Sequence, residues 1–130
     1  MARNQTTTHI REVGTVAVPV ADPERAVAFY VGTLGFEVRR DVPFGQGERW
    51  IEVAPAGATT TIALAPPGGL TPGVDSGIRL VTLDCEADHR DLRDRGADVG
   101  EIMRWPGVPP MFSMHDPDGN TLYVVEGSAG

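Results

Sequence analysis

The chain has 130 residues, of which 41% are apolar and 22% are charged. These proportions are typical of a globular domain and exclude an intrinsically disordered chain. No apolar run approaches the roughly 18 residues of a membrane-spanning helix. The first eleven residues are polar and lack the apolar stretch of a signal peptide. We therefore expect a single cytoplasmic domain with no membrane partner.

The charge balance excludes nucleic acid as a partner. The net charge of −7 comes from 18 acidic and 11 basic residues, and every base is an arginine. An acidic chain with scattered arginines lacks the basic patch of a nucleic-acid-binding protein. The single cysteine, Cys85, excludes an intramolecular disulfide and a Cys-x-x-Cys zinc site.

The first half of the chain has the pattern of one strand, one helix and three further strands. Apolar residues alternate over Val16–Val20, which predicts a half-buried strand. Asp22 followed by Pro23 is typical of a helix start, and Gly35 of a helix end. The strands that we expect next are Phe36–Val42, Arg49–Val53 and Thr59–Leu64.

The second half repeats this order. Alternation over Ile78–Leu83 predicts a strand, Asp84 is suited to begin a helix, and Gly96 to end it. The strands expected after it are Val99–Met103, Met111–Met114 and Thr121–Val125.

The spacing of the helix signals indicates a duplication. The two capping aspartates are 62 residues apart, and the two terminating glycines are 61 apart. This offset predicts two βαβββ modules. A four-stranded sheet with one helix leaves a face uncovered, so we expect the modules to face each other across a concave cleft.

Composition places the boundaries of these parts. A polar tail at 1–12 precedes one domain at 13–126, and residues 127–130 form a short C-terminal tail. Within the domain, module one covers about 13–65 and module two covers 77–126. The Gly- and Pro-rich stretch at 66–76 is predicted to be a linker.

Two motifs carry a family resemblance. The segment Val18–Tyr30, followed by Leu34–Val38, resembles the opening of a vicinal oxygen chelate module. Asp116–Asn120 (DPDGN), followed by Leu122–Glu126, resembles the last hairpin of the second module. The chain is thus similar to the glyoxalase, bleomycin-resistance and extradiol-dioxygenase superfamily, which implies an α+β fold of two βαβββ modules. That fold hosts isomerases, lyases, dioxygenases and binding proteins, so it does not fix the function.

The resemblance also implies where a metal would bind. The four ligand positions of the metalloenzymes fall here on Thr15, Ala63, Gly77 and Tyr123, none of which is His, Asp or Glu. A shift of two residues adds only Asp75 as a hard ligand. We therefore expect no metal and no cofactor.

The histidines and the cysteine offer no substitute site. His9 lies in the polar tail and is expected to be exposed, whereas His89 lies on the inner side of the second helix and is expected to be partly buried with one hydrogen bond. His115 ends a strand whose face the sequence leaves open. Cys85 lies on the core side of a helix, where an inert buried thiol is favoured over a nucleophile.

Strand alternation selects the side chains of the cleft. If Ile51, Val53, Ile62 and Leu64 face the helix, their neighbours face the cleft. The resulting mixture suits an aromatic or apolar molecule with a few polar anchors. The predicted ligand-binding residues are Thr15, Trp50, Glu52, Thr61, Ala63, Arg79, Trp105 and Tyr123.

Several roles remain open for these residues. Arg79 and Glu52 are suited to a structural ion pair; alternatively, Arg79 clamps a carboxylate or phosphate and Glu52 acts as a general base. Glu52 and Tyr123 are the catalytic candidates. Packing is favoured over stacking for Trp50, while Trp105 lies in a loop at 104–110 that is predicted to cover the cleft.

Three functions compete at this point. The first is a metal-independent protein that binds an aromatic metabolite or antibiotic. The second is an enzyme, a lyase or isomerase, that uses acid–base residues without a metal. The third is a glyoxalase- or dioxygenase-like metalloenzyme whose ligands lie elsewhere. Because each module leaves a sheet face and an edge uncovered, we also expect a homodimer whose clefts draw residues from one chain or from both.

Overall fold

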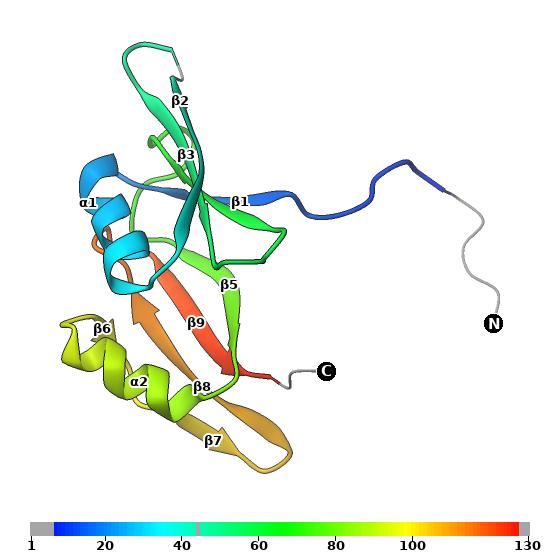
Figure 1. The fold of residues 1–130 in the computed structure, drawn as a ribbon, viewed down its shortest axis with the longest axis vertical. Helices are drawn as coiled ribbons and strands as arrows, with labels where there is room; N and C mark the ends of the chain where they lie inside the picture. Colours follow the sequence, from blue (N-terminus) through cyan, green and yellow to red (C-terminus); the bar gives the residue numbers. More distant parts are fainter. Residues whose placement is uncertain (1–6, 44, 128–130) are drawn as a thin grey trace.

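The structure is a computed structural model that describes residues 7–43 and 45–127. Two sheets, each carrying one helical segment, follow one another along the chain (Figure 1). The first module contains β1 (Thr15–Pro19), α1 (Pro23–Val27), η1 (Ala28–Thr33), β2 (Glu37–Pro43), β3 (Arg49–Ala54) and β4 (Thr61–Ala65). The second contains β5 (Asp75–Thr82), α2 (Cys85–Asp94), β6 (Asp98–Val99), β7 (Met103–Trp105), β8 (Val108–His115) and β9 (Thr121–Glu126).

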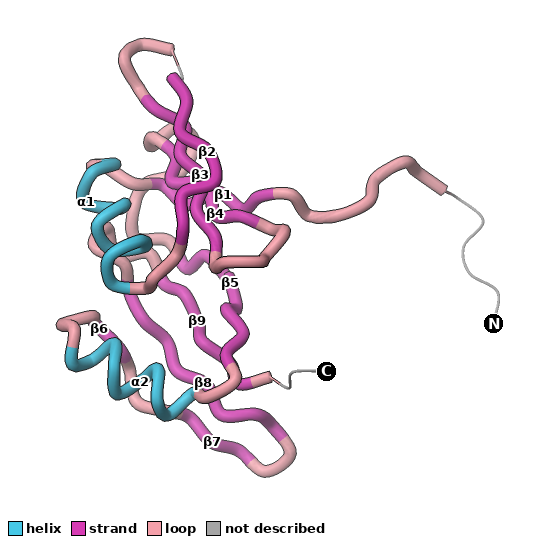
Figure 2. Tube along the Cα trace, in the orientation of Figure 1, coloured by secondary structure: helices cyan, strands magenta, loops and turns pink. Residues whose placement is uncertain are grey.

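The two sheets share one topology, as expected for a duplicated unit. The strand order is β1-β4-β3-β2 in the first sheet and β5-β9-β8-β6 in the second, where β7 also pairs with β8. The first strand of each module runs parallel to the last, and the remaining pairs are antiparallel. Both first strands, β1 and β5, therefore lie at a sheet edge (Figure 2).

The capping residues begin and end the helices where the sequence places them. The Asp22 side chain accepts hydrogen bonds from the backbone N–H groups of Glu24 and Arg25, and Asp84 accepts one from Ala87. These bonds satisfy N–H groups that have no partner within the helix. Gly35 and Gly96 adopt φ values of +80° and +87°, a conformation that glycine reaches without strain.

The second half of the first helical segment differs from the expected α-helix. Residues Ala28–Thr33 form a π-helical segment, and the Leu34 N–H donates to the Phe29 carbonyl five residues earlier. The apolar stripe of the sequence is compatible with both helix types, so it does not reveal the wider turn.

One hydrophobic core joins both modules. The alternating residues that were expected to face the helix, Ile51, Val53, Ile62 and Leu64, are buried, and Val18 and Leu122 lie in the same core. Phe112 and Met114 of β8 and Leu92 of α2 belong to the same cluster.

Three expected boundaries in the second module differ from the structure. β5 begins at Asp75, inside the stretch that was expected to be linker. The expected strand over Val99–Met103 is split into β6 and β7. The expected covering loop at 104–110 is a β-hairpin, in which Trp105 of β7 pairs with Val108 of β8. Pro106 and Gly107 supply its turn, and the two prolines that suggested a loop lie in the first residues of β8, where a strand tolerates them.

Candidate functional site

A polar cluster centred on Glu52 lies on the first sheet. The Trp50 indole Nε1 donates to Glu52 Oε2 at 2.7 Å, and the Thr61 hydroxyl donates to Glu52 Oε1 at 2.9 Å. The Oγ1 atoms of Thr61 and Thr15 are 2.7 Å apart. Both carboxylate oxygens are therefore held by donors of the same sheet, which fixes the orientation of the Glu52 side chain.

Strand alternation and register bring these four residues together. Ile51 and Val53 of β3 are fully buried, so Trp50 and Glu52 lie on the opposite face, where both are half-buried. In the register of the parallel pair, Thr15 of β1 lies opposite Thr61 of β4. The expectation that these four side chains share one face is confirmed.

An open hollow lies over this cluster. It is lined by Trp50 and Glu52 of β3 together with Arg40 and Val42 of β2. Ala63, which was expected to contact a ligand, is fully buried between β1 and β3. It offers no surface to a ligand, and in the sheet it lies opposite Glu52 of the neighbouring strand.

A second cluster lies on the second sheet. The Arg79 guanidinium sits over the Tyr123 ring at 4.2 Å from its centroid, and Arg79 Nη1 donates to the Gly77 carbonyl. The Tyr123 hydroxyl donates to Asp75 Oδ2 at 2.8 Å. This hydrogen bond lowers the pKa of Asp75 and raises the pKa of Tyr123. A phenol with a raised pKa is a weaker source of phenolate at neutral pH, which disfavours Tyr123 as a base.

The structural ion pair, which was one of the alternatives left open for Glu52 and Arg79, does not form within the described residues. Each side chain is held by its own sheet: Glu52 by Trp50 and Thr61, and Arg79 by Tyr123. The sequence supplied two opposite charges but not the angle between the modules, and that angle decides whether they meet.

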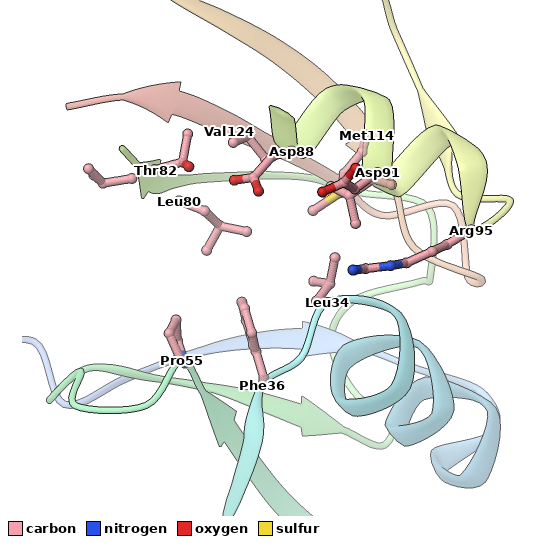
Figure 3. A pocket seen from close by; sticks show the side chains of 12 residues that line it. Leu34, Phe36, Pro55, Leu80, Thr82, Asp88, Asp91, Arg95, Met114 and Val124 are labelled. Atoms are coloured by element: carbon pink, nitrogen blue, oxygen red, sulfur yellow. The ribbon is translucent and has the colours of Figure 1, made fainter. Parts of the chain in front are cut away.

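A different cavity separates the modules on their helical side. It is lined by Leu34 and Phe36 of module one and by Leu80, Leu92 and Met114 of module two, and its volume is about 220 Å³ (Figure 3). Asp88, Asp91 and Arg95 of α2 line the same space. The sequence patterns gave no sign that a gap would remain between the two modules.

Comparison of the sequence with known protein families identifies the family of this chain. The model of the Glyoxalase/Bleomycin resistance protein/Dioxygenase superfamily matches residues 12–124. The chain belongs to this superfamily. The resemblance of its opening segment and of its DPDGN hairpin is thereby confirmed, as is the expected fold of two βαβββ modules.

Three proteins illustrate the degree of similarity to known sequences and structures. The uncharacterized protein YetH of Bacillus subtilis (strain 168) is 32% identical over 123 residues, covering 90% of this chain and 99% of YetH. The crystal structure of TnmS3, an antibiotic binding protein from Streptomyces sp. CB03234, is 37% identical with a TM-score of 0.79 and covers 94% of this chain and all of TnmS3. A superfamily member from Sphaerobacter thermophilus DSM 20745 is 34% identical with a TM-score of 0.86, covering 92% of this chain and all of the other.

The metal site of the superfamily's metalloenzymes does not fit the residues found here. Thr15 contacts Thr61, Ala63 is buried, Gly77 has no side chain, and the Tyr123 hydroxyl is bound to Asp75. Across residues 7–43 and 45–127, no three His, Cys, Asp or Glu side chains converge as a metal site requires. The side chains at these positions are therefore unsuited to a metal centre.

The three histidines and the cysteine lie outside the two clusters. His89 is partly buried, lies 2.8 Å from the Gly100 carbonyl through Nε2, and meets the Phe112 ring edge-on, which confirms its expected role. His9 is exposed, and the exposed His115 lies 3.2 Å from Asp98 Oδ2. Cys85 is fully buried, and this burial raises the pKa of its thiol, as expected of an inert cysteine.

Sequence reasoning missed three residues of these clusters. Asp75, which binds the Tyr123 hydroxyl, lay in the stretch that was expected to be linker. Arg40 and Val42 line the hollow because β2 pairs with β3 in a register that places them opposite Glu52 and Trp50. A hairpin alignment of those two strands is the one signal that would have found them.

Trp105, which was predicted to contact a ligand, is 51% exposed on the β7–β8 hairpin.

Proposed function

We propose that this protein binds an aromatic small molecule at the hollow over Trp50 and Glu52, without a metal. The observation that carries the proposal is the Glu52 carboxylate, half-buried beside an indole ring and fixed by two donors from its own sheet. TnmS3, which is described as an antibiotic binding protein, supports this class of ligand through its similarity over 94% of the chain. We also place the protein in the cytoplasm, on composition alone. No helix within the described residues is long and apolar enough to span a membrane.

The cluster defines which chemical groups suit the site. A carboxylate has about four lone-pair positions, and the two hydrogen bonds from Trp50 and Thr61 occupy two of them. The remaining positions accept an N–H or O–H group of a ligand. The indole of Trp50 and the side chain of Val42 offer apolar surface to an aromatic ring. We expect a planar ligand that carries a hydrogen-bond donor.

The second candidate function is a metal-free acid–base reaction at the same carboxylate. It is favoured by the open lone pairs of Glu52, since a general base must reach the proton that it abstracts. The two functions differ in one readout. A binding protein returns its ligand unchanged after incubation, whereas an enzyme converts it to a product that chromatography detects.

A binding experiment tests the proposal with a defined probe. The fluorophore 8-anilinonaphthalene-1-sulfonate combines fused aromatic rings, an N–H donor and an anionic group. We expect Glu52→Gln and Trp50→Ala each to weaken its binding at least tenfold, while the control Glu101→Gln, at an exposed carboxyl far along the chain, leaves it unchanged. Equal affinity for all four proteins would overturn the proposed site. A thermal-shift screen of aromatic metabolites and antibiotics then searches for the natural ligand.

A further inference from the structure

The cavity on the helical side of the modules has apolar walls from both of them. Leu34 and Phe36 of module one lie on one side of it, Leu80 and Met114 of module two lie on the other, and its volume is about 220 Å³ (Figure 3). Met114 is 1% exposed and belongs to the hydrophobic core, so the cavity reaches down to the core. Walls of this kind bind hydrocarbon because its burial removes apolar surface from water.

This cavity is separate from the hollow over Trp50 and Glu52. Leu80 lines the cavity, whereas its neighbour Arg79 lies over the Tyr123 ring on the other face of β5. The hollow is lined by β2 and β3, and the two spaces share no lining residue. A ligand of the cavity is therefore independent of the proposed function.

One wall of the cavity carries negative charge. Asp88 and Asp91 of α2 are three residues apart, so they share a helix face, and both line the cavity (Figure 3). Asp91 Oδ1 accepts a hydrogen bond from Arg90 at 3.1 Å, whereas the half-buried Asp88 carboxylate has neither a donor nor a cation as partner among the described residues. Asp84 already caps α2 by accepting from the Ala87 N–H. A carboxylate that is partly removed from water and unpaired favours a cationic group.

The arginine that lines the cavity does not neutralise this wall. Arg95 Nη1 donates to the carbonyl of Thr33 in module one at 2.8 Å, so its guanidinium reaches across one end of the cavity (Figure 3). Within the described residues Arg95 forms no ion pair with Asp88 or Asp91. Two carboxylates thus face one guanidinium, in a chain whose net charge is −7. The potential at the cavity therefore favours a cation over an anion.

We propose that this cavity binds a small organic cation, a protonated primary amine whose apolar body is about the size of one aromatic ring. The ammonium group donates to Asp88 and Asp91, and the apolar body lies against Leu34, Phe36 and Met114. An apolar cavity of about 150 Å³ accepts benzene. The 220 Å³ found here therefore accommodates one ring and a short chain. Because the walls come from both modules, the amine binds only the folded arrangement and should raise the unfolding temperature.

Two probes of matched shape test the recognition of charge. 2-Phenylethylamine carries an ammonium group at neutral pH, and 2-phenylethanol replaces it with a neutral hydroxyl. In calorimetric titrations of the wild type we expect the amine to bind at least about tenfold more tightly than the alcohol, because only the amine forms charge-assisted hydrogen bonds. Asp88→Asn should remove that difference by weakening the amine alone. Unchanged affinity for the alcohol then shows that the cavity is intact.

Two control variants separate this site from its surroundings. Asp94→Asn alters an exposed acid of the same helix that lies outside the cavity lining. It removes the same charge as Asp88→Asn and should change the affinity for neither probe. Glu52→Gln should leave the affinity for the amine unchanged, because Glu52 lines the hollow and not the cavity.

NMR of methyl-labelled methionine locates the bound amine. Met114 lines the cavity, whereas Met103 and Met111, which pair with each other on β7 and β8, lie outside its lining. We expect the Met114 methyl signal, assigned with Met114→Leu, to shift most when the amine is added. This measurement uses the wild-type protein, so together with the ratio of the two affinities it tests the site even if Asp88→Asn fails to fold.

Four results would overturn the amine site. They are a wild type that binds neither probe or binds both equally, a Met114 signal that does not move, an Asp94→Asn variant that loses as much amine affinity as Asp88→Asn, and a loss of amine affinity in Glu52→Gln. The last result would place the amine in the hollow and support the proposed function instead. Failure to bind 8-anilinonaphthalene-1-sulfonate counts against the proposed function and leaves the amine measurements unaffected.

Discussion

The hydroxyl of Tyr30 in the first module donates a 2.9 Å hydrogen bond to Asp116 Oδ2 in the second, and both side chains are buried. Asp116 begins the DPDGN segment, whose residues make further bonds to module one. Asn120 Nδ2 donates to the Pro19 carbonyl, and Asp118 Oδ1 accepts from the Ala21 N–H and from Arg25. The segment thus joins the two modules and constrains the angle between their sheets.

Replacement of Tyr30 by Phe removes one bond of this junction. Asp116 Oδ2 keeps the hydrogen bond from Asn120 Nδ2, so the carboxylate is not left without a donor. We expect the free energy of unfolding to fall by about 1–3 kcal/mol, the usual cost of losing a buried hydrogen bond to a charged group. Urea unfolding of the wild type and of Tyr30→Phe measures this difference in free energy. Tyr123→Phe, which removes a hydroxyl whose hydrogen bond to Asp75 lies at the surface, is the control and should change stability much less.

The buried phenol of Tyr30 also predicts a loss of stability at alkaline pH. Burial, and then the charge and hydrogen bond of Asp116, raise the pKa of Tyr30 far above its ordinary value of 10.0. Because the pKa of Tyr30 is higher in the folded protein than in the unfolded chain, its contribution to the free energy of unfolding is fully present below pH 10.0. The free energy of unfolding falls as the pH rises beyond 10.0, because only the phenol of the unfolded chain ionises there. One such group contributes a slope of about 1.4 kcal/mol per pH unit.

Stability curves for the wild type and Tyr30→Phe between pH 8 and pH 12 check this point. The variant should be less stable at pH 8, and the two curves should converge as the pH rises. Parallel curves over the whole range would show that Tyr30 does not carry the alkaline sensitivity.

The helix caps and buried faces could be predicted because their causes are local. Asp22 and Asp84 bond to N–H groups two or three residues away, and alternation alone separates Ile51 from Glu52. The contact between Tyr30 and Asp116 spans 86 residues, and DPDGN has the local pattern of an ordinary turn. For the same reason sequence reasoning could list Glu52 and Arg79 together but could not determine that each binds its own sheet. Distances between modules depend on packing that no short pattern encodes.

The donor chemistry of the site predicts that function is independent of divalent metals. Thr15, Ala63, Gly77 and Tyr123 provide no imidazole or carboxylate at the four positions that bind metal in the superfamily's metalloenzymes. Elemental analysis of the purified protein should find well under one equivalent of any divalent metal, and a chelator should leave probe affinity and the unfolding midpoint unchanged. A stoichiometric metal whose removal abolishes binding would contradict the metal-free proposal.

Arg79 should govern affinity for anionic ligands while contributing little to stability. The guanidinium is exposed, and its contacts are the Tyr123 ring and the Gly77 carbonyl, so its removal leaves no buried charge without a partner. We expect Arg79→Ala to lower the free energy of unfolding by less than about 1 kcal/mol, the scale of an exposed cation–π contact. The same change should weaken binding of a carboxylate or phosphate ligand at the second sheet by about 1.5–3 kcal/mol, since that anion would lose a charge-assisted hydrogen bond. Arg90→Ala, at an exposed arginine of α2, is the matched control and should alter neither quantity. A variant at Arg79 that loses stability yet keeps its affinity would show that the arginine serves the fold rather than the ligand.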